Sequence, residues 1–292
     1  LLVPIMVEQL LSSLMGTADT MMVSNVGSAA ISAVSLVDAI NILVIQALSA
    51  LAAGGAILCS QYLGSQNLKK AKRSAEQVLF VMLVLSCSLS LLCLIFRFPL
   101  LRLIFGTVDT DVMANSQIYF FFTLLSFPFI GLYDAGASIL RAQNNTKGPM
   151  TISILSNFLN IGGNAILIFV FGMGVAGAAA ASLLGNAAGI LVVLPYLLSK
   201  KRTFRFVLRV GDLRETGREL ASSCSSFATD KASRIFSGLT VNLLLMYFVG
   251  NIGVALYAVY SQLRFILRIL AGGALQTIST LGSMLYGERD FY

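Results

Sequence analysis

The sequence predicts an all-helical integral membrane protein, in which a six-helix N-terminal lobe is followed by the first two helices of a pseudo-symmetric C-terminal lobe. Three observations lead to this prediction. Of the 292 residues, 57% are hydrophobic and 11% are charged, whereas a soluble domain carries about a quarter charged residues. Apolar stretches long enough to cross a bilayer recur along the chain, and short motifs from the first two stretches return near its end.

Eight membrane-spanning segments are expected, because a helix needs about 20 mostly apolar residues to cross the hydrocarbon core. Helices are the form expected for all of them, since unpaired backbone is not tolerated in lipid and the sequence lacks the alternating pattern of a membrane barrel. The expected helices cover residues 1–24, 29–58, 75–98, 116–140, 150–171, 175–198, 221–249 and 253–285.

Basic residues predict the orientation of these helices. Fourteen of the 20 lysines and arginines lie in connectors that follow even-numbered helices, whereas the other connectors hold only Arg97 and Arg102. Cytoplasmic loops carry the excess of basic residues, so both ends of the chain are expected inside, in a multi-pass protein of the cell (plasma or inner) membrane. The net charge of +7 then reflects a surface that faces membrane lipid, and nucleic acid is not an expected partner.

An internal repeat indicates a two-lobe plan. Residues 25–27 (Asn-Val-Gly) recur at 251–253 (Asn-Ile-Gly), and the Ser and Gly at the ends of 60–64 recur at 283–287. The nearly constant offset predicts that the seventh and eighth helices begin a second copy of the first unit, so that four helices of the second copy are missing. The expected domains are a six-helix lobe at 1–198, a basic cytoplasmic connector at 199–220 and a partial second lobe at 221–292.

Polar side chains within the first and fifth helices form a candidate ion site. Glu8 and Asp19 lie on one face of the first helix, and an amide stripe of the fifth helix contains Asn157, Asn160 and Asn164. Carboxylate, amide and hydroxyl oxygens can hold a proton or a sodium ion. Hydrogen bonding between helices is the alternative explanation of the stripe.

Further polar groups are expected to line a cavity. Arg264 and Arg268 stand one turn apart near mid-membrane, so their face of the eighth helix must line water or meet an acid. Asp38 and Asp134 complete the set of buried acids, and Asp134 has Arg141 as a local candidate partner. The expected cavity-lining residues are Glu8, Asn157, Asp134, Arg264, Arg268 and Gln276.

Absent motifs argue against an enzyme. The chain has no histidine, no CxxC pair and no GxxxxGK[ST] loop, so no metal site of the His/Cys type and no ATP-hydrolysing loop are expected. A GxGxxG match at 172–177 links two spanning helices and lacks the acid of a dinucleotide site about 20 residues on. No cofactor is expected, and an ion gradient is the predicted driving force. An integral-membrane enzyme is a weaker alternative.

An ordered set of short motifs resembles one transporter family, the multidrug and toxic compound extrusion (MATE) family. The motifs are Pro4 ahead of Gln9, DTMMV at 19–23, SQYLG at 60–64, LRA at 140–142, NTKGP at 145–149, GAA at 177–179 and YGE at 286–288. The resemblance runs from end to end. It implies twelve helices in two six-helix lobes, and export of organic cations or amphiphilic drugs in exchange for protons or sodium.

The resemblance also implies roles for single residues. The family's N-lobe cation site falls on Asp19, Asn160, Asn164 and Ser182. The second carboxylate of that site is an amide here, at Asn164, so Asp19 alone would take the proton or hold the sodium ion. Pro4 matches the proline at which the first helix is thought to bend.

The two arginines at 264 and 268 have no counterpart in the family pattern and favour an anionic or zwitterionic substrate. The alternative function is therefore a lipid-linked oligosaccharide flippase of the same superfamily. The missing helices are expected to be needed for transport, so that this chain is either inactive alone or works with a partner that supplies them.

Overall fold

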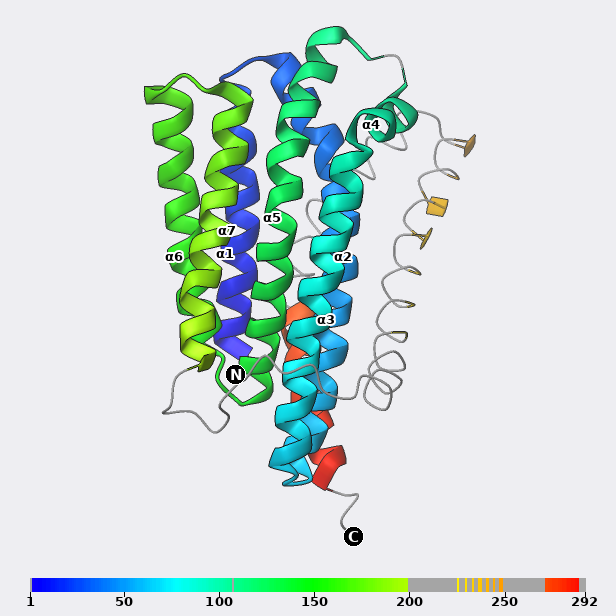
Figure 1. The fold of residues 1–292 in the computed structure, drawn as a ribbon, viewed down its shortest axis with the longest axis vertical. Coiled ribbons are helices and arrows are strands. Elements are labelled where there is room, and N and C mark those ends of the chain that lie inside the picture. The colour runs from blue at the N-terminus through cyan, green and yellow to red at the C-terminus, as the bar shows by residue number, and fades with distance from the viewer. Residues whose placement is uncertain are drawn as a thin grey trace.

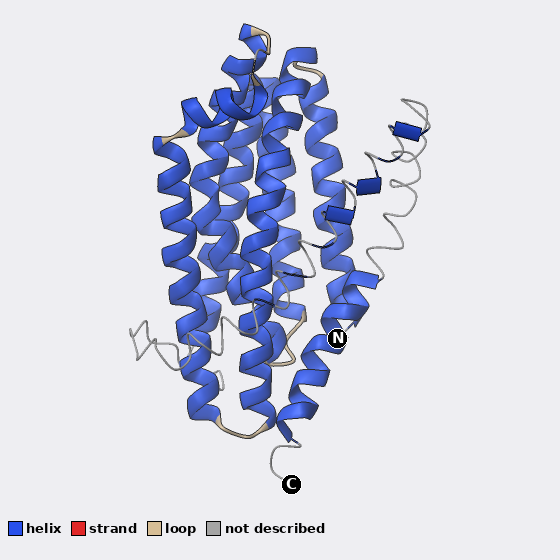
Figure 2. Cartoon of the chain, turned by 90° about the vertical axis from the view of Figure 1, so that its right-hand side faces the viewer, coloured by secondary structure: helices blue, strands red, loops and turns tan. Residues whose placement is uncertain are grey.

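The computed structural model describes residues 2–106, 108–198 and 271–288, together with ten single positions between 225 and 248. Every element in these parts is helical, as Figures 1 and 2 show. The elements are α1 (Leu2–Ser24), α2 (Ser28–Gly64), α3 (Leu68–Ile95), α4 (Arg97–Phe105), α5 (Thr110–Ala142), α6 (Lys147–Asn164), the π-helix η1 (Ala165–Val170) and α7 (Gly174–Leu198). Residues 271–288 are helical too. The all-helical fold class is confirmed.

Five of the described helices are long and apolar enough to cross a membrane, with α6 and η1 counted as one. The first helix, α1, is not among these five, although it has 23 residues. It contacts α6, α2 and α7, and of its two carboxylates Glu8 is buried and Asp19 is half-buried. Most residues of the expected helices at 221–249 and 253–285 lie outside the described residues.

Several helices are longer than hydropathy alone predicted. The expected start of the third helix was residue 75, but α3 begins at Leu68, with Asn67 capping it by accepting a hydrogen bond from the Lys70 amide at 3.1 Å. Hydropathy detects only the apolar part of a helix. A helix that extends beyond the hydrocarbon core keeps its basic side chains in the polar interface. The predicted start was therefore too late, because it excluded the basic first turns of α3.

A short helix, α4, was not expected between α3 and α5. Its first residue, Arg97, lies over the rings of Phe98 and Phe121, with the guanidinium carbon 4.6 and 5.1 Å from the ring centroids. This stacking holds a cation against aromatic rings at the end of the bundle, which is typical of a membrane interface. Figure 1 shows α4 at the end of the bundle that lies opposite the N-terminus.

The connectors alternate between the two ends of the bundle. Those after α2 and α5 lie at the end that also holds the N-terminus and the end of α7, whereas those after α1, α3 and η1 lie at the other end (Figure 1). The basic residues at 69–73, 141 and 147 therefore gather at one end. This distribution is the one used above to predict the orientation.

The core is centred on α5, which packs against α2, α3 and α7. One buried cluster joins Met82 of α3 to Ile139 and Leu140 of α5, and a second surrounds Phe120 and Phe127 of α5. Large apolar side chains on the outer faces, including Leu91, Leu103 and Leu191, are exposed. Exposed apolar residues on several helices are expected where the surrounding solvent is lipid.

Residues 271–288 pack closely against α1 and α2. A Cβ added at Gly273 would lie 2.8 Å from Cγ of Met6, and one at Gly64 would collide with the backbone oxygen of Met284. A Cβ at Gly287 would in turn collide with the backbone oxygen of Gln61.

This last pair of contacts is reciprocal. The repeat relates residues 60–64 to 283–287, so Gln61 corresponds to Met284 and Gly64 to Gly287. Gly64 contacts Met284, and its equivalent Gly287 contacts Gln61, which is the equivalent of Met284. Reciprocal contacts of this kind are produced by a twofold relation between two units.

Candidate cation-coupling site

The structure brings together the four residues that the family resemblance assigns to cation coupling. Asn164 donates hydrogen bonds from Nδ2 to Oδ1 of Asp19 and to Oδ1 of Asn160, the latter at 3.2 Å. Asn160 donates from its own Nδ2 to Oγ of Ser182 at 3.0 Å. This continuous chain of hydrogen bonds joins α1, α6 and α7.

The local sequence explains how α6 presents its amides. Asn157, Asn160 and Asn164 recur at helical spacing, and all three are buried. The neighbouring helix α7 comes close because it carries glycine at the contact: a Cβ at Gly185 would lie 3.1 Å from the Ser156 backbone oxygen. Gly189, four residues on, also contacts Ser156, so Gly185 and Gly189 form a GxxxG pair that packs closely on α6.

A π-helix begins directly after Asn164. In η1 the backbone widens, and the Phe171 amide that follows it bonds the Ile166 oxygen at 3.0 Å, a spacing of five residues. A turn with positive φ at Gly172 and Gly174 (63° and 56°) then leads into α7. Short π segments are frequent at functional sites. No sequence pattern singled out η1, because its residues are uniformly apolar.

Asp19 has polar neighbours but no described counter-ion. The two ion pairs found among the described residues join other side chains. Asn164 is fully buried, and in the described part of the chain its Oδ1 has no hydrogen-bond partner, nor does Nδ2 of the buried Asn157. The site therefore offers carboxylate, amide and hydroxyl oxygens, the donors that a hard cation such as sodium prefers.

A second carboxylate, Asp38 of α2, lies near Asp19. Its Oδ1 accepts hydrogen bonds from Nδ2 of Asn41 at 3.1 Å and from the hydroxyl of Tyr119 at 3.2 Å. Val23 of α1, one turn after Asp19, and Val37 of α2, next to Asp38, belong to one buried cluster. Sequence analysis counted Asp38 among the buried acids but gave it no role. The position of Asn41, one turn after Asp38, was the available signal.

Glu8 has a different environment from Asp19, although both lie on α1. Its Oε1 forms an ion pair with Nη2 of Arg141 at 2.7 Å and accepts a hydrogen bond from the Tyr133 hydroxyl at 3.1 Å. Both partners belong to α5, and the pair is buried. Arg141 thus pairs with Glu8 from another helix, whereas sequence analysis considered only the nearby Asp134 for it.

The remaining predicted residues are spread along the bundle. Pro4 lies in the first turn of α1, where its missing amide hydrogen costs no helical hydrogen bond. Asp134 is half-buried on α5, and Gln276 is half-buried in the helical segment 271–288. Arg264 and Arg268 lie outside the described residues.

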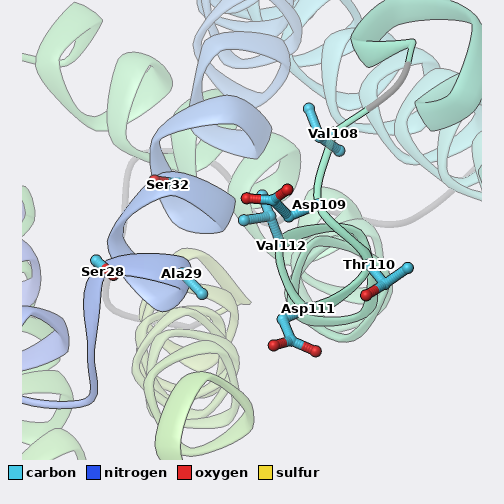
Figure 3. Close-up of a pocket in the computed structure, with 8 residues that line it drawn as sticks. All are labelled: Ser28, Ala29, Ser32, Val108, Asp109, Thr110, Asp111 and Val112. Atoms are coloured by element: carbon cyan, nitrogen blue, oxygen red, sulfur yellow. The ribbon is translucent and has the colours of Figure 1, made fainter.

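A polar pocket opens where α2 and α5 begin, at the end opposite the N-terminus (Figures 1 and 3). It has a volume of about 610 Å³. Its lining residues are Ser28, Ala29, Ser32, Val108, Asp109, Thr110, Asp111 and Val112. The two carboxylates give this mouth a negative charge, which favours the approach of cations. Sequence analysis did not identify this pocket, since its residues come from two helix starts about 80 positions apart.

Comparison with known proteins gives consistent matches. The family MatE matches residues 4–166. The uncharacterized transporter YisQ of Bacillus subtilis is 26% identical over 292 residues, covering 98% of this chain and 64% of its own length. The probable multidrug resistance protein YoeA of the same organism is 26% identical over 300 residues, covering 99% of this chain and 64% of its own length.

Nearly the whole of this chain superposes on part of a solved structure. The crystal structure of MATE in the bent conformation superposes with a TM-score of 0.91 at 23% identity, covering 98% of this chain and 64% of that one. The chain thus spans 64% of the length of these three relatives. The family match covers more than half of the chain and includes Asp19, Asn160 and Asn164. The chain is therefore a multi-pass membrane protein that belongs to the MATE family, whose members are transporters and not enzymes.

Proposed function

We propose that the protein is a secondary active antiporter, which exports organic cations or amphiphilic drugs in exchange for protons or sodium. The observation that carries this proposal is the hydrogen-bonded chain from Asp19 through Asn164 and Asn160 to Ser182. It places one carboxylate among buried oxygen donors inside a membrane protein. An ionisable group in such a position is costly, and marks an ion or substrate pathway.

The same hydrogen bonds suggest how a cation changes the packing of helices. Asn164 donates to Asp19, so this bond ties α1 to α6 most strongly while the carboxylate is charged. A proton or sodium ion at Asp19 neutralises that charge and weakens the tie. Cation binding thereby shifts the balance between two arrangements of α1, as alternating access requires.

The cargo and the orientation are parts of the same proposal. Kinship with a protein named as a probable multidrug resistance protein supports an organic, amphiphilic cargo. The end of the bundle that gathers the basic residues at 69–73, 141 and 147 faces the cytoplasm. The acidic pocket at the start of α2 and α5 then opens to the outside, where coupling cations enter.

The test is transport by the full-length protein reconstituted in liposomes. Efflux of ethidium, a fluorescent organic cation, is followed under a proton gradient and, separately, under a sodium gradient. We expect one of the two gradients to drive efflux in the wild type, and Asp19→Asn to abolish it. The matched control is Glu76→Gln, which removes a carboxylate from the ion pair with Lys72 on α3 and is expected to retain efflux.

Two results would contradict the proposal. Normal gradient-driven efflux by Asp19→Asn would exclude this carboxylate as the coupling group. Absence of efflux in the wild type under both gradients would exclude the antiporter and favour the lipid-linked oligosaccharide flippase. In that case neutralising Arg264 and Arg268 should abolish translocation of a lipid headgroup.

A further inference from the structure

Asp38 is held as a second acidic centre in the same lobe. It lies on α2, where Asn41 follows it by one turn, and it faces Tyr119 of α5. Both hydrogen bonds reach Oδ1, at 3.1 and 3.2 Å. Among the described residues Oδ2 receives no hydrogen bond and no ion pair reaches Asp38, so one carboxylate oxygen is left for a ligand.

The Asn41 side chain provides a second, independent observation that points to a ligand. It is 6% exposed, and its Nδ2 is used by Asp38. Its Oδ1 has no partner within the described parts of the chain. A buried carbonyl oxygen without a hydrogen-bond partner is unfavourable, because it has lost its hydration. Because the Asn41 carboxamide is bonded to Asp38 through its Nδ2, the two acceptors without a hydrogen bond, Oδ1 of Asn41 and Oδ2 of Asp38, belong to neighbouring side chains.

The arrangement repeats that of Asp19. Each carboxylate accepts a hydrogen bond from the Nδ2 of a buried asparagine, and each asparagine keeps an Oδ1 without a described partner. Val23 of α1, Val37 of α2 and Tyr119 of α5 belong to one buried cluster, so the part of α1 that carries Asp19 lies beside Asp38 and Tyr119. Tyr119 on α5 and Asp19 on α1 are thus the described titratable groups that surround Asp38.

We propose that Asp38, with Asn41 and Tyr119, forms a second site for a monovalent cation, a proton or sodium, coupled to the site at Asp19. This inference rests on the antiporter function proposed above and deepens it. Mutual repulsion disfavours two charged acids side by side, so a cation at either one favours the charged form of the other. When both sites are filled, the lobe takes up two positive charges in each transport cycle, although position 164 holds an amide.

Infrared difference spectroscopy tests the site without transport. Spectra of the purified full-length protein are recorded on addition of sodium and on acidification, for the wild type, Asp19→Asn and Asp38→Asn. We expect two carboxyl signals in the wild type, with one lost in each variant. Tyr119→Phe, a milder change, should shift the Asp38 signal and preserve it. A wild-type spectrum in which every carboxyl signal disappears in Asp19→Asn alone, or is unchanged by Asp38→Asn, would overturn the second site.

Membrane voltage measures the stoichiometry. Exchange of two monovalent cations for one ethidium moves one net charge across the membrane. A membrane potential of about 60 mV should therefore change the ratio of ethidium concentrations inside and outside the liposomes about tenfold. We expect this voltage response in the wild type and its loss in Asp38→Asn. A wild type that responds to ion gradients but not to voltage would contradict the second site and leave the antiporter intact. Lack of transport in the wild type would instead contradict the antiporter, while the infrared signals still decide the site.

Discussion

The two carboxylates of α1, Glu8 and Asp19, stand three turns apart on one face of the same helix but have opposite surroundings. Glu8 is buried against α5 with the guanidinium of Arg141 as its counter-ion. Asp19 is half-buried against α6 and contacts an amide. Near Glu8 the helix is also closely packed by Gly272 and Gly273 of the segment 271–288.

The difference shows that the role of a charged residue within a membrane helix depends on its neighbours. A buried acid with its counter-ion belongs to the scaffold, because removing either partner leaves an uncompensated charge. An acid that contacts an amide and has no described counter-ion keeps its charge available for a mobile cation. The helix is thereby anchored at its Glu8 end and free to respond to ions at its Asp19 end. Four substitutions test this contrast on a common scale, the stability of the detergent-solubilised full-length protein.

The largest loss is expected for Arg141→Ala, which leaves Glu8 buried without its counter-ion. Breaking one partner of a buried ion pair costs about 3–5 kcal/mol. Thermal unfolding should therefore occur at a clearly lower temperature than in the wild type. The double variant Glu8→Gln with Arg141→Met should recover much of the loss, since it removes both charges. If Arg141→Ala unfolds at the wild-type temperature, Glu8 is not anchored by this pair.

A smaller loss of stability is expected for Gly287→Ala, at the contact between the segment 271–288 and α2. The new methyl group would collide with the Gln61 backbone oxygen of α2, and overpacking of this kind costs about 1–3 kcal/mol. Gly282→Ala is the matched control, because no atom lies within 4 Å of an added Cβ there. The control should be neutral or stabilising, since alanine is the better helix former. Equal melting temperatures for both variants would show that the contact is not close.

Asp19→Asn should change stability by no more than about 1 kcal/mol, because the new amide oxygen can still accept from Asn164. Transport should nevertheless be lost, as described above. The measurement is thermal unfolding of the same preparation that is assayed for efflux. A loss as large as that of Arg141→Ala would place Asp19 in the scaffold beside Glu8 and erase the contrast.

The smallest effect is expected for Lys72→Ala. Lys72 pairs with Glu76 one turn along α3 at 3.7 Å, and its side chain is 36% exposed. Such pairs contribute about 0–1 kcal/mol, and less as salt is added. Comparing melting temperatures at low and high salt measures this contribution. A marked loss would mean that charge pairing stabilises this protein regardless of burial.

Hydropathy and spacing predicted much of this architecture. Long apolar runs predicted the spanning helices, and the spacing of Asn157, Asn160 and Asn164 predicted a polar face on α6, because both signals are local. The pairing of these amides with Asp19 and Ser182 followed from family resemblance rather than from spacing. The structure places these side chains in hydrogen-bonding contact.

Other features depend on contacts that sequence separation conceals. Glu8 and Arg141 are 133 positions apart, so the local neighbour Asp134 seemed the simpler partner for Arg141. The partnership of Asp38 with Tyr119 spans 81 positions. The π-helix and α4 were missed for another reason. Hydropathy depends only on amino-acid composition, and it carries no signal of backbone winding or of side chains that stack at the membrane interface.

The reciprocal contact of Gly64 and Gly287 bears on how such a protein arises. Because each side of the contact is the counterpart of the other, one surface serves both partners, as in a symmetric homodimer. A single unit with a glycine at this position already carries everything needed to meet a second copy of itself. Joining two copies of the gene into one would preserve the contact without any new surface, and each lobe could then diverge while the shared glycine kept them in register.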